Sequence, residues 1–484
     1  MRDITQGNVT KRMLWFALPF LAANILQQLY NTAALVIVGK YAGKQALAAV
    51  GSAAPIMNIM MFLMIGITLG TSVLISEFYG AKDWQKVKEE QATALVGGML
   101  FSVAVSILAL LFTRPLLRLI RTPEEILPMA EAYLHIILAG LIFSFLYNLL
   151  ASSLRSVGNA GMPLVFLLIS SVLNIGISIW LVRDCGLGVR GAAISTVVSQ
   201  AVSVALCLLY IRFKTPVLHV GLRQLKINAG MLAKTFQYSS VSAVQQTFLY
   251  VGVFILQGAV NPLGVDAIAA YSAVTKIDGF ILAPTDSLAL ALTIFTSTNR
   301  GAKKSGRIRS GLWSAFGIGQ VYCLIISLCV YLLAPTLMLF FLEPHETEAI
   351  AIGIRYLRTI AFCYFFAGFT NPCQGFFRGL GKMKITLYAT LIQIPMRLAL
   401  AYLLVPYFGL SVIALAMAAG WFSMLVFELY QIRKYWRNEA PLELQAAGEV
   451  PNDEIKHEPE EVPNEEVPQE LPEPAAEGEE KTEA

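Results

Sequence analysis

Residues 13–38 read MLWFALPFLAANILQQLYNTAALVIV, a run that contains no charged side chain. A helix needs roughly 20 apolar residues to cross the hydrocarbon core of a bilayer. The run exceeds that length, and it is also longer than the apolar core of a cleavable signal peptide. It therefore predicts a membrane-spanning helix close to the start of the chain.

The same pattern recurs along the whole body of the chain. Apolar runs between clusters of charged residues, Gly and Pro predict twelve spans, with limits near 13–38, 46–76, 90–112, 126–152, 162–182, 189–212, 235–261, 266–297, 308–333, 348–377, 384–405 and 410–432. The runs are continuous and do not alternate between apolar and polar residues, which favours helices over strands. The predicted fold class is an all-α membrane protein with twelve transmembrane helices.

Composition narrows the class of protein further. Of the 484 residues, 56% are hydrophobic and 14% are charged, whereas about 25% are charged in a typical soluble domain. The six cysteines show no metal-binding spacing, and the sequence holds neither a nucleotide-binding loop nor the common hydrolase motifs. We therefore expect no enzyme, no metal centre, no cofactor and no nucleic-acid partner.

Lysine and arginine predict the orientation, because cytoplasmic loops carry an excess of both. With a cytoplasmic N-terminus, the segments on that side hold 23 basic residues and those on the other side hold seven. We expect a multi-pass protein of the plasma (inner) membrane with both termini in the cytoplasm. Residues 439–484 hold 16 of the 32 acidic residues and lack apolar periodicity, which is typical of a disordered tail.

The chain also repeats itself. At a shift of 223 residues, LRSVG at 154–158 falls on FRGLG at 377–381, and near a shift of 221, GAK at 80–82 falls on GAK at 301–303. Six spans per repeat is an even number, so the two halves share one orientation. Parallel repeats of this kind are a transporter architecture in which the substrate path lies between the halves. The predicted organisation is an N-lobe at 1–213 with six helices, a cytoplasmic linker at 214–232, a C-lobe at 233–437 with six helices, and the disordered acidic tail at 438–484.

Several stretches, in their order along the chain, resemble the multidrug and toxic compound extrusion (MATE) transporters. They are ALPFLAANILQQLYNTAALVIVGKYAGKQALAAVG at 17–51, GAKD at 80–83, LRSVGNAGMP at 154–163, GVRGAAISTVVSQ at 188–200 and RGLGKMK at 378–384. The resemblance spans roughly residues 10–435. It implies two six-helix lobes that form a V, open in turn to each side of the membrane, and export of amphipathic, often cationic compounds against a flow of H⁺ or Na⁺.

Two positions depart from the pattern of that family. Many members carry Asp after the Tyr-Asn pair of the first helix, where this chain has Ala34, and the fifth span usually ends its Asn-x-x-x-Asp motif with Asp, where this chain has Ser178. Asn174 and Thr196 of the same implied cation site persist. Neutral oxygens can hold Na⁺ weakly, but they do not titrate near neutral pH. Asn174, Ser178 and Thr196 therefore stay ion-coupling candidates without a carboxylate.

Ionisable residues at membrane depth are costly, so each is a candidate functional residue. The eighth span holds Lys276, Asp278 and Asp286, and the eleventh holds Arg397. A buried arginine needs a carboxylate or carbonyl groups, and we expect Asp278 or Asp286 to supply it. One interpretation is a static ion pair that locks the C-lobe; the other is a protonatable cluster of Lys276, Asp278 and Arg397 whose pairing changes during transport.

A second set of polar and adaptable side chains is predicted to line a substrate cavity. Its members are Gln27, Gln28, Asn31, Met57, Met61, Gln245, Gln246 and Asn371. Amides can equally form hydrogen bonds between helices, and methionines can equally be packing residues. Glu77 and Glu428 lie near cytoplasmic helix ends, and we expect each to reach the surface or to pair with a nearby Lys or Arg.

These patterns together favour a secondary exporter, a monomeric antiporter of amphipathic, cationic small molecules or drugs driven by H⁺ or Na⁺. A flippase for lipid-linked precursors or a polysaccharide exporter is the alternative, and it would carry several cationic residues facing the cavity. A membrane enzyme would need clustered catalytic residues at one face, and a scaffold or receptor would need no ion coupling.

Overall fold

The computed structural model describes residues 4–120 and 122–439. Within these residues every regular element is helical, which confirms the predicted all-α class. Ten helices are long and apolar enough to cross a membrane, and one further pair of shorter helices does so together. The first helix is long enough for two spans, so the described chain holds the twelve predicted spans.

The first helix, α1, runs over Val9–Gly80, and its 72 residues include a break at Gly43. A straight helix of that length would be about 108 Å long, far more than the thickness of a bilayer. Gly43 has φ 89° and ψ 176°, a conformation open to glycine because it has no side chain. This break divides α1 into the first and second spans.

The next four spans complete the first half of the chain. They are α2 (Trp84–Leu119), the bent pair α3 (Leu127–Ala139) and α4 (Leu141–Ser156), α5 (Gly161–Ile179) with the π-helical turn Trp180–Asp184, and α6 (Gly188–Lys214). The bend between α3 and α4 is 46° and lies at Gly140. The predicted fourth span at 126–152 is therefore two short helices.

Six more spans form the second half. They are α7 (Ala229–Val260), α8 (Val265–Gly301), α9 (Ser305–Leu339), α10 (Thr347–Gly379), α11 (Met383–Phe408) and α12 (Ser411–Lys434), followed by the turn Tyr435–Glu439. Helix α7 begins inside the stretch predicted as linker. The reason is a cap: Oδ1 of Asn228 accepts hydrogen bonds from the backbone N–H groups of Gly230 at 3.0 Å and Met231 at 3.2 Å. Most of the predicted acidic tail lies outside the described residues.

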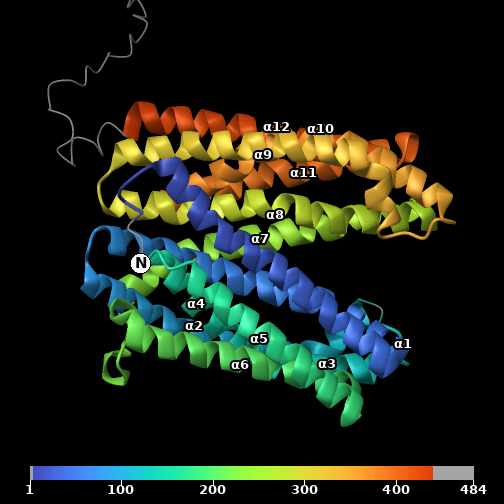
Figure 1. Ribbon diagram of the computed structural model, residues 1–484, viewed down its shortest axis with the longest axis horizontal. Coiled ribbons are helices and arrows are strands. Elements are labelled where there is room, and N and C mark those ends of the chain that lie inside the picture. Colours follow the sequence, from blue (N-terminus) through green and yellow to red (C-terminus); the bar gives the residue numbers. More distant parts are fainter. Residues whose placement is uncertain (1–3, 121, 440–484) are drawn as a thin grey trace, which may run out of the picture.

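Each half has its own hydrophobic core. One buried cluster draws its residues from 37–193, and another draws them from 256–421. In Figure 1 helices α2 to α6 lie on one side, α7 to α12 lie on the other, and α1 crosses between them. The first turns of α1 belong to the second half by packing, because Met13, Phe16 and Phe20 join a cluster with Phe295 and Phe376.

The two halves approach closely where small residues of α1 meet α7. A Cβ atom added at Gly66 would overlap the backbone of Ala243, and one added at Gly70 would lie 2.6 Å from the backbone nitrogen of Ser239. Glycines spaced four apart let two membrane helices pack backbone to backbone. The contact between the lobes therefore depends on the absence of side chains at these positions.

The end of α1 meets the end of α8 in the same way. Gly80 lies against Thr298, and Gly301 lies against the carbonyl of Glu77. The Glu77 carboxylate forms an ion pair with Arg300 at 3.6 Å, as expected for a carboxylate near a helix end. The lobes are thus joined at the end of the molecule that carries the α1–α2 and α8–α9 turns.

Candidate functional site

Two carboxylates of α8 face α10. Tyr364 donates a hydrogen bond to Asp278. Seven residues further along α10, Nδ2 of Asn371 donates to Oδ1 of Asp286 at 2.9 Å and to Oγ1 of Thr285 at 2.9 Å. Residues seven apart lie on one face of a helix. One face of α10 therefore contacts both aspartates.

Asp286 lies near the middle of α8 and is nevertheless exposed to solvent, whereas Asp278 is half-buried. Helix α8 packs against α1, α9 and α10. An ionised carboxylate at membrane depth is tolerated when water or a polar partner reaches it. Asp286 has a polar partner, since Asn371 binds one of its oxygens, and the rest of its side chain is not covered by protein.

Arg378 is a cation close enough to this site to interact with Asp286. It interacts electrostatically with Asp286 and with Glu428, and its Nε donates to the carbonyl of Gln374 at 3.2 Å. The predicted tenth span ends at 377 and so leaves Arg378 in the loop that follows it. Helix α10 continues to Gly379 and places Arg378 on the helix.

The predicted ion pair of Arg397 is wrong. Among the described residues no ion pair joins Arg397 to Asp278 or Asp286, and its Nε, which is buried, has no hydrogen-bond partner. Tyr271 and Tyr356 lie close enough to interact electrostatically with both Arg397 and Asp278. The reason is helix packing: α11 packs mainly against α12 and α7, whereas α8 packs against α10 and α1.

Lys276 does not complete a cluster either. Its side chain is exposed, and in the described part of the chain it forms no ion pair with Asp278. Two residues apart on a helix, side chains point in different directions. Lys276, Asp278 and Arg397 therefore form no ion pairs with one another in the described structure.

The N-lobe candidates do come together. Nδ2 of Asn174 donates to Oγ of Ser195 at 3.3 Å and to Oγ1 of Thr196 at 3.5 Å, and the Tyr30 hydroxyl donates to Thr196 at 3.5 Å. Oδ1 of Asn174 and Oγ of Ser178 are buried without a hydrogen-bond partner. Hard cations prefer oxygen ligands, so this group can accept a monovalent cation but offers no group that carries a proton near neutral pH.

Ala34 lies one helical turn after Tyr30 on α1. Residues four apart share a helix face, so a carboxylate at position 34 would lie on the face of α1 that reaches Thr196. The departure of this chain from the family pattern is thus located beside the N-lobe cluster.

The polar face of α1 contacts the C-lobe. Nδ2 of Asn24 donates to Oγ of Ser287 at 3.0 Å, and Nε2 of Gln28 donates to the carbonyl of Gly279 at 3.4 Å. Gln27 bonds Asn31 within α1 at 3.3 Å, and Asn31 is exposed. Of the predicted cavity residues on α1, Gln28 therefore lies at the contact with α8, whereas Gln27 and Asn31 bond each other.

Gln245 belongs to a buried network and is a poor candidate for contact with substrate. Its Nε2 donates to Oε1 of Gln374 at 2.7 Å and to Oγ1 of Thr390 at 3.0 Å. Gln374 in turn donates to Glu428 at 2.5 Å, and Glu428 is fully buried. Of the two expected roles of Glu428, reaching the surface is wrong, because Gln374 and other residues of α10 cover it. Interaction with a nearby basic residue is the role that the structure supports, since Glu428 interacts electrostatically with Arg378.

Replacement of Gln245 by Leu is expected to lower the free energy of unfolding by about 1–3 kcal/mol, because buried partners lose their hydrogen bonds. Thermal unfolding of the purified protein in detergent measures this. Gln246→Leu is the matched control, since Gln246 is half-buried and forms no side-chain hydrogen bond with the described residues. A lower affinity for transported dye with unchanged stability in Gln245→Leu would restore Gln245 to the substrate site.

Met57 and Met61 are half-buried, and Met57 packs against the core of the first half. Asn371 binds Asp286 and so belongs with the α8 carboxylates. Of the eight predicted cavity residues, the structure therefore assigns Gln245 and Asn371 to polar networks and Met57 to packing. Within residues 4–120 and 122–439, no group of three or more His, Cys, Asp or Glu side chains could hold a metal ion.

The family model described as MatE matches this chain twice, at residues 19–180 and 242–403. The two matched segments are offset by 223 residues, which is the shift at which the sequence matches itself. The repeat detected from short matches therefore covers both halves of the membrane body.

Several individual proteins are similar to this chain in sequence or in structure. "Probable multidrug resistance protein YoeA" of Bacillus subtilis is 28% identical over 401 residues, which cover 81% of this chain and 85% of that protein. "Probable multidrug resistance protein YpnP" of the same organism is 26% identical over 394 residues, covering 81% and 87%. A solved structure described as MATE in the bent conformation has a TM-score of 0.84 at 22% identity and covers 92% of this chain and 98% of that one.

Proposed function

Because the chain belongs to the MatE family of multidrug efflux transporters, we propose that it exports amphipathic, cationic small molecules in exchange for H⁺ or Na⁺. It is a multi-pass membrane transporter and not an enzyme. The two similar relatives carry multidrug resistance in their names, and this supports drugs as the class of substrate.

The proposal that ion flow drives export rests on the position of Asp286. It is a carboxylate near the middle of a membrane helix, exposed to solvent, bonded by Asn371 and close to Arg378. A carboxylate can bind a proton or Na⁺. When neither is bound, Arg378 can stabilise the negative charge of Asp286. Binding of the ion would then weaken the attraction of Asp286 for Arg378. The N-lobe group around Asn174 is the second candidate, and it suits Na⁺ alone.

In this proposal the lobes alternate between openings toward the two sides of the membrane. The structure has the lobes in contact at the end where α1 meets α7 and α8. An ion that binds one arrangement of the lobes more tightly shifts the equilibrium toward that arrangement. The size of the shift is set by the difference between the ion's affinities for the two arrangements. Entry of the ion from outside would favour the outward-open state and release of the exported compound.

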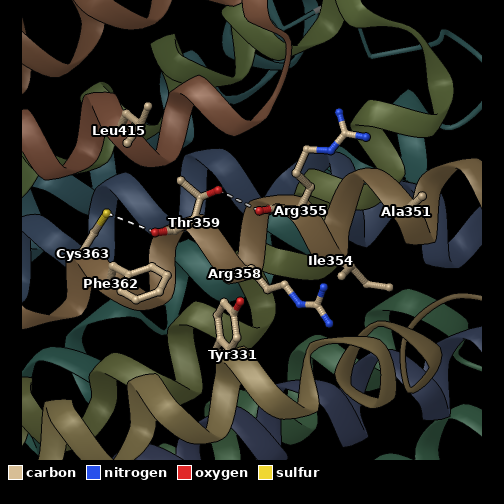
Figure 2. Close-up of a pocket in the computed structure, with 9 residues that line it drawn as sticks. All are labelled: Tyr331, Ala351, Ile354, Arg355, Arg358, Thr359, Phe362, Cys363 and Leu415. Carbon is tan, nitrogen blue, oxygen red and sulfur yellow. Dashed lines mark hydrogen bonds between the residues drawn. The ribbon is translucent and has the colours of Figure 1, made fainter.

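The alternative, a flippase for lipid-linked precursors or a polysaccharide exporter, would need several cations facing the path between the lobes. Arg397 is buried, and Arg355 and Arg358 lie on the outer side of α10 (Figure 2). Lys276 is the fourth base that the sequence places away from the ends of the spans, and it is an exposed cation on α8. This count favours the exporter.

Reconstituted vesicles test the proposal. With the protein in proteoliposomes, we expect a fluorescent cationic dye to move against its gradient when ΔpH or ΔNa⁺ is imposed, and not when both are dissipated. Two separate gradients identify the coupling ion. Dye movement that is the same with and without either gradient would contradict antiport.

We propose further that both termini lie in the cytoplasm of a cell whose plasma membrane holds the protein. The basis is the excess of Lys and Arg on that side. Fused after residue 484, a fluorescent protein should be bright, and alkaline phosphatase should be inactive, because the two reporters mature on opposite sides of the membrane. The reverse pattern would invert the proposed orientation.

A further inference from the structure

A groove of about 650 Å³ lies on the outer surface of the C-lobe. Helix α10 forms its floor, Tyr331 of α9 borders one side, and Leu415 of α12 borders the other (Figure 2). Arg355 and Arg358 of α10 line it together with apolar side chains. The transport proposal uses neither arginine.

The groove faces away from the rest of the protein. The opposite face of α10 carries Tyr364 and Asn371, which bond α8. Phe362 is 72% exposed and Leu415 is 56% exposed, and in Figure 2 helix α1 lies behind α10. In a membrane such an apolar, outward surface contacts lipid.

The arginine backbones lie just inside the hydrocarbon boundary, within side-chain reach of the lipid headgroups. Helix α10 has 33 residues and is about 50 Å long, so about 10 Å extends beyond each side of a 30 Å hydrocarbon core. Arg355 lies about 12 Å from the first residue, Thr347, and Arg358 lies about one turn deeper. In Figure 2 the Arg358 side chain extends along α10 toward its start and the membrane surface, whereas the Arg355 side chain rises away from the helix axis. Long basic side chains reach the interface in this way.

The two guanidinium groups carry uncompensated charge. In the part of the chain that the structure describes, neither Arg355 nor Arg358 forms an ion pair with a carboxylate. Arg358 lies 5.5 Å from the ring centroid of Tyr331. The Thr359 hydroxyl is already bonded to the carbonyl of Arg355 at 2.8 Å. The arginines are therefore the free donors of the groove, and each presents five N–H groups in a planar fork.

We propose that this groove binds an anionic glycerophospholipid. Arg355 and Arg358 bind the phosphate, since the guanidinium fork matches two phosphate oxygens at once. They are three residues apart and so are neighbours on one helix face, and rotation of the two long side chains would let one phosphate meet both. An acyl chain lies along Phe362 and Leu415. The lipid belongs to the outer leaflet if the proposed orientation holds, because α10 begins on that side.

Native mass spectrometry of the purified full chain tests this binding. Phosphatidylglycerol and phosphatidylcholine with identical acyl chains are titrated separately into the detergent-solubilised protein. We expect the wild type to retain phosphatidylglycerol in preference. In the double variant Arg355→Gln/Arg358→Gln, affinity for phosphatidylglycerol should fall about tenfold or more, while affinity for phosphatidylcholine should not change.

A matched control removes the same charge elsewhere. Arg114 and Arg118 are exposed near the same-side end of α2, and Arg114→Gln/Arg118→Gln should bind phosphatidylglycerol like the wild type. Arg355→Lys/Arg358→Lys keeps the charge but not the fork, and it should bind with intermediate affinity. Thermal unfolding confirms that each variant is folded.

Equal retention of the two lipids by the wild type, or equal loss in the α2 double variant, would overturn the proposal. The measurement needs no transport, so its failure would leave the exporter proposal untouched.

Discussion

Replacement of Asp286 by Asn is expected to reduce ion-driven dye export in proteoliposomes to the level of empty vesicles. Asn is nearly the same shape, and its carbonyl oxygen can still accept the hydrogen bond from Asn371 that Asp286 accepts now at 2.9 Å. It cannot bind a proton at neutral pH or carry a negative charge toward Arg378. The local structure should therefore persist while coupling is lost.

Three comparisons make this result specific. Asp266 lies exposed in the first turn of the same helix, so Asp266→Asn should export dye at the wild-type rate. The variant Asp278→Asn distinguishes the role of Asp278 from that of Asp286. Dye export at the wild-type rate in this variant would remove Asp278 from the mechanism. Equilibrium binding of the dye should survive in Asp286→Asn. Export at the wild-type rate under both gradients in that variant would refute the role of Asp286.

The double variant Gly66→Ala/Gly70→Ala is expected to separate the lobes at the end where they now touch. Each added methyl would enter the space of α7, since a Cβ at Gly66 overlaps the backbone of Ala243 and one at Gly70 lies 2.6 Å from the nitrogen of Ser239. Overpacking of this kind costs about 1–3 kcal/mol per site. Because the overlap lies between the lobes and not within either core, moving the lobes apart relieves it.

The same helix offers a matched control. Gly51 of α1 has nothing within 4 Å of an added Cβ, so Gly51→Ala should leave the lobes in place and, if anything, stabilise the helix by roughly 0.5–1 kcal/mol. Spin labels at the exposed positions Gln85 and Ser310, with the exposed Cys185 and Cys329 replaced by Ser, report the distance between the lobes. We expect a longer distance in the double variant alone.

An unchanged distance in the double variant, with unchanged dye export, would show that α1 and α7 accommodate the methyl groups. The close contact would then not hold the lobes together. A longer distance together with slower export would support a contact that opens and closes during transport.

Much of the fold follows from local patterns in the sequence. The uncharged run at 13–38, its eleven counterparts and the 223-residue shift predict twelve helices in two repeated halves, and the helices and the two family matches confirm both. Lipid imposes length and apolarity on each span separately, so each span can be recognised without its neighbours. Asn174 and Thr196 were also placed together by family pattern, and the structure brings them within 3.5 Å.

The partners of buried polar groups do not follow from the sequence. The expected partner of Arg397 is an α8 aspartate, yet α11 packs mainly on α12 and α7, and Asp278 is bonded by Tyr364. Gln245 was expected at a cavity, and it lies in a network that ends at the buried Glu428. Arg378 was counted as a loop residue and lies on α10.

By itself the sequence determined the number of spans, their helical nature, the duplication and the family. Tertiary structure alone decided which charged and amide side chains meet. The physical reason is that membrane insertion depends on the composition of one helix at a time, whereas a hydrogen bond or ion pair between helices depends on which helices are neighbours and how each is rotated about its axis.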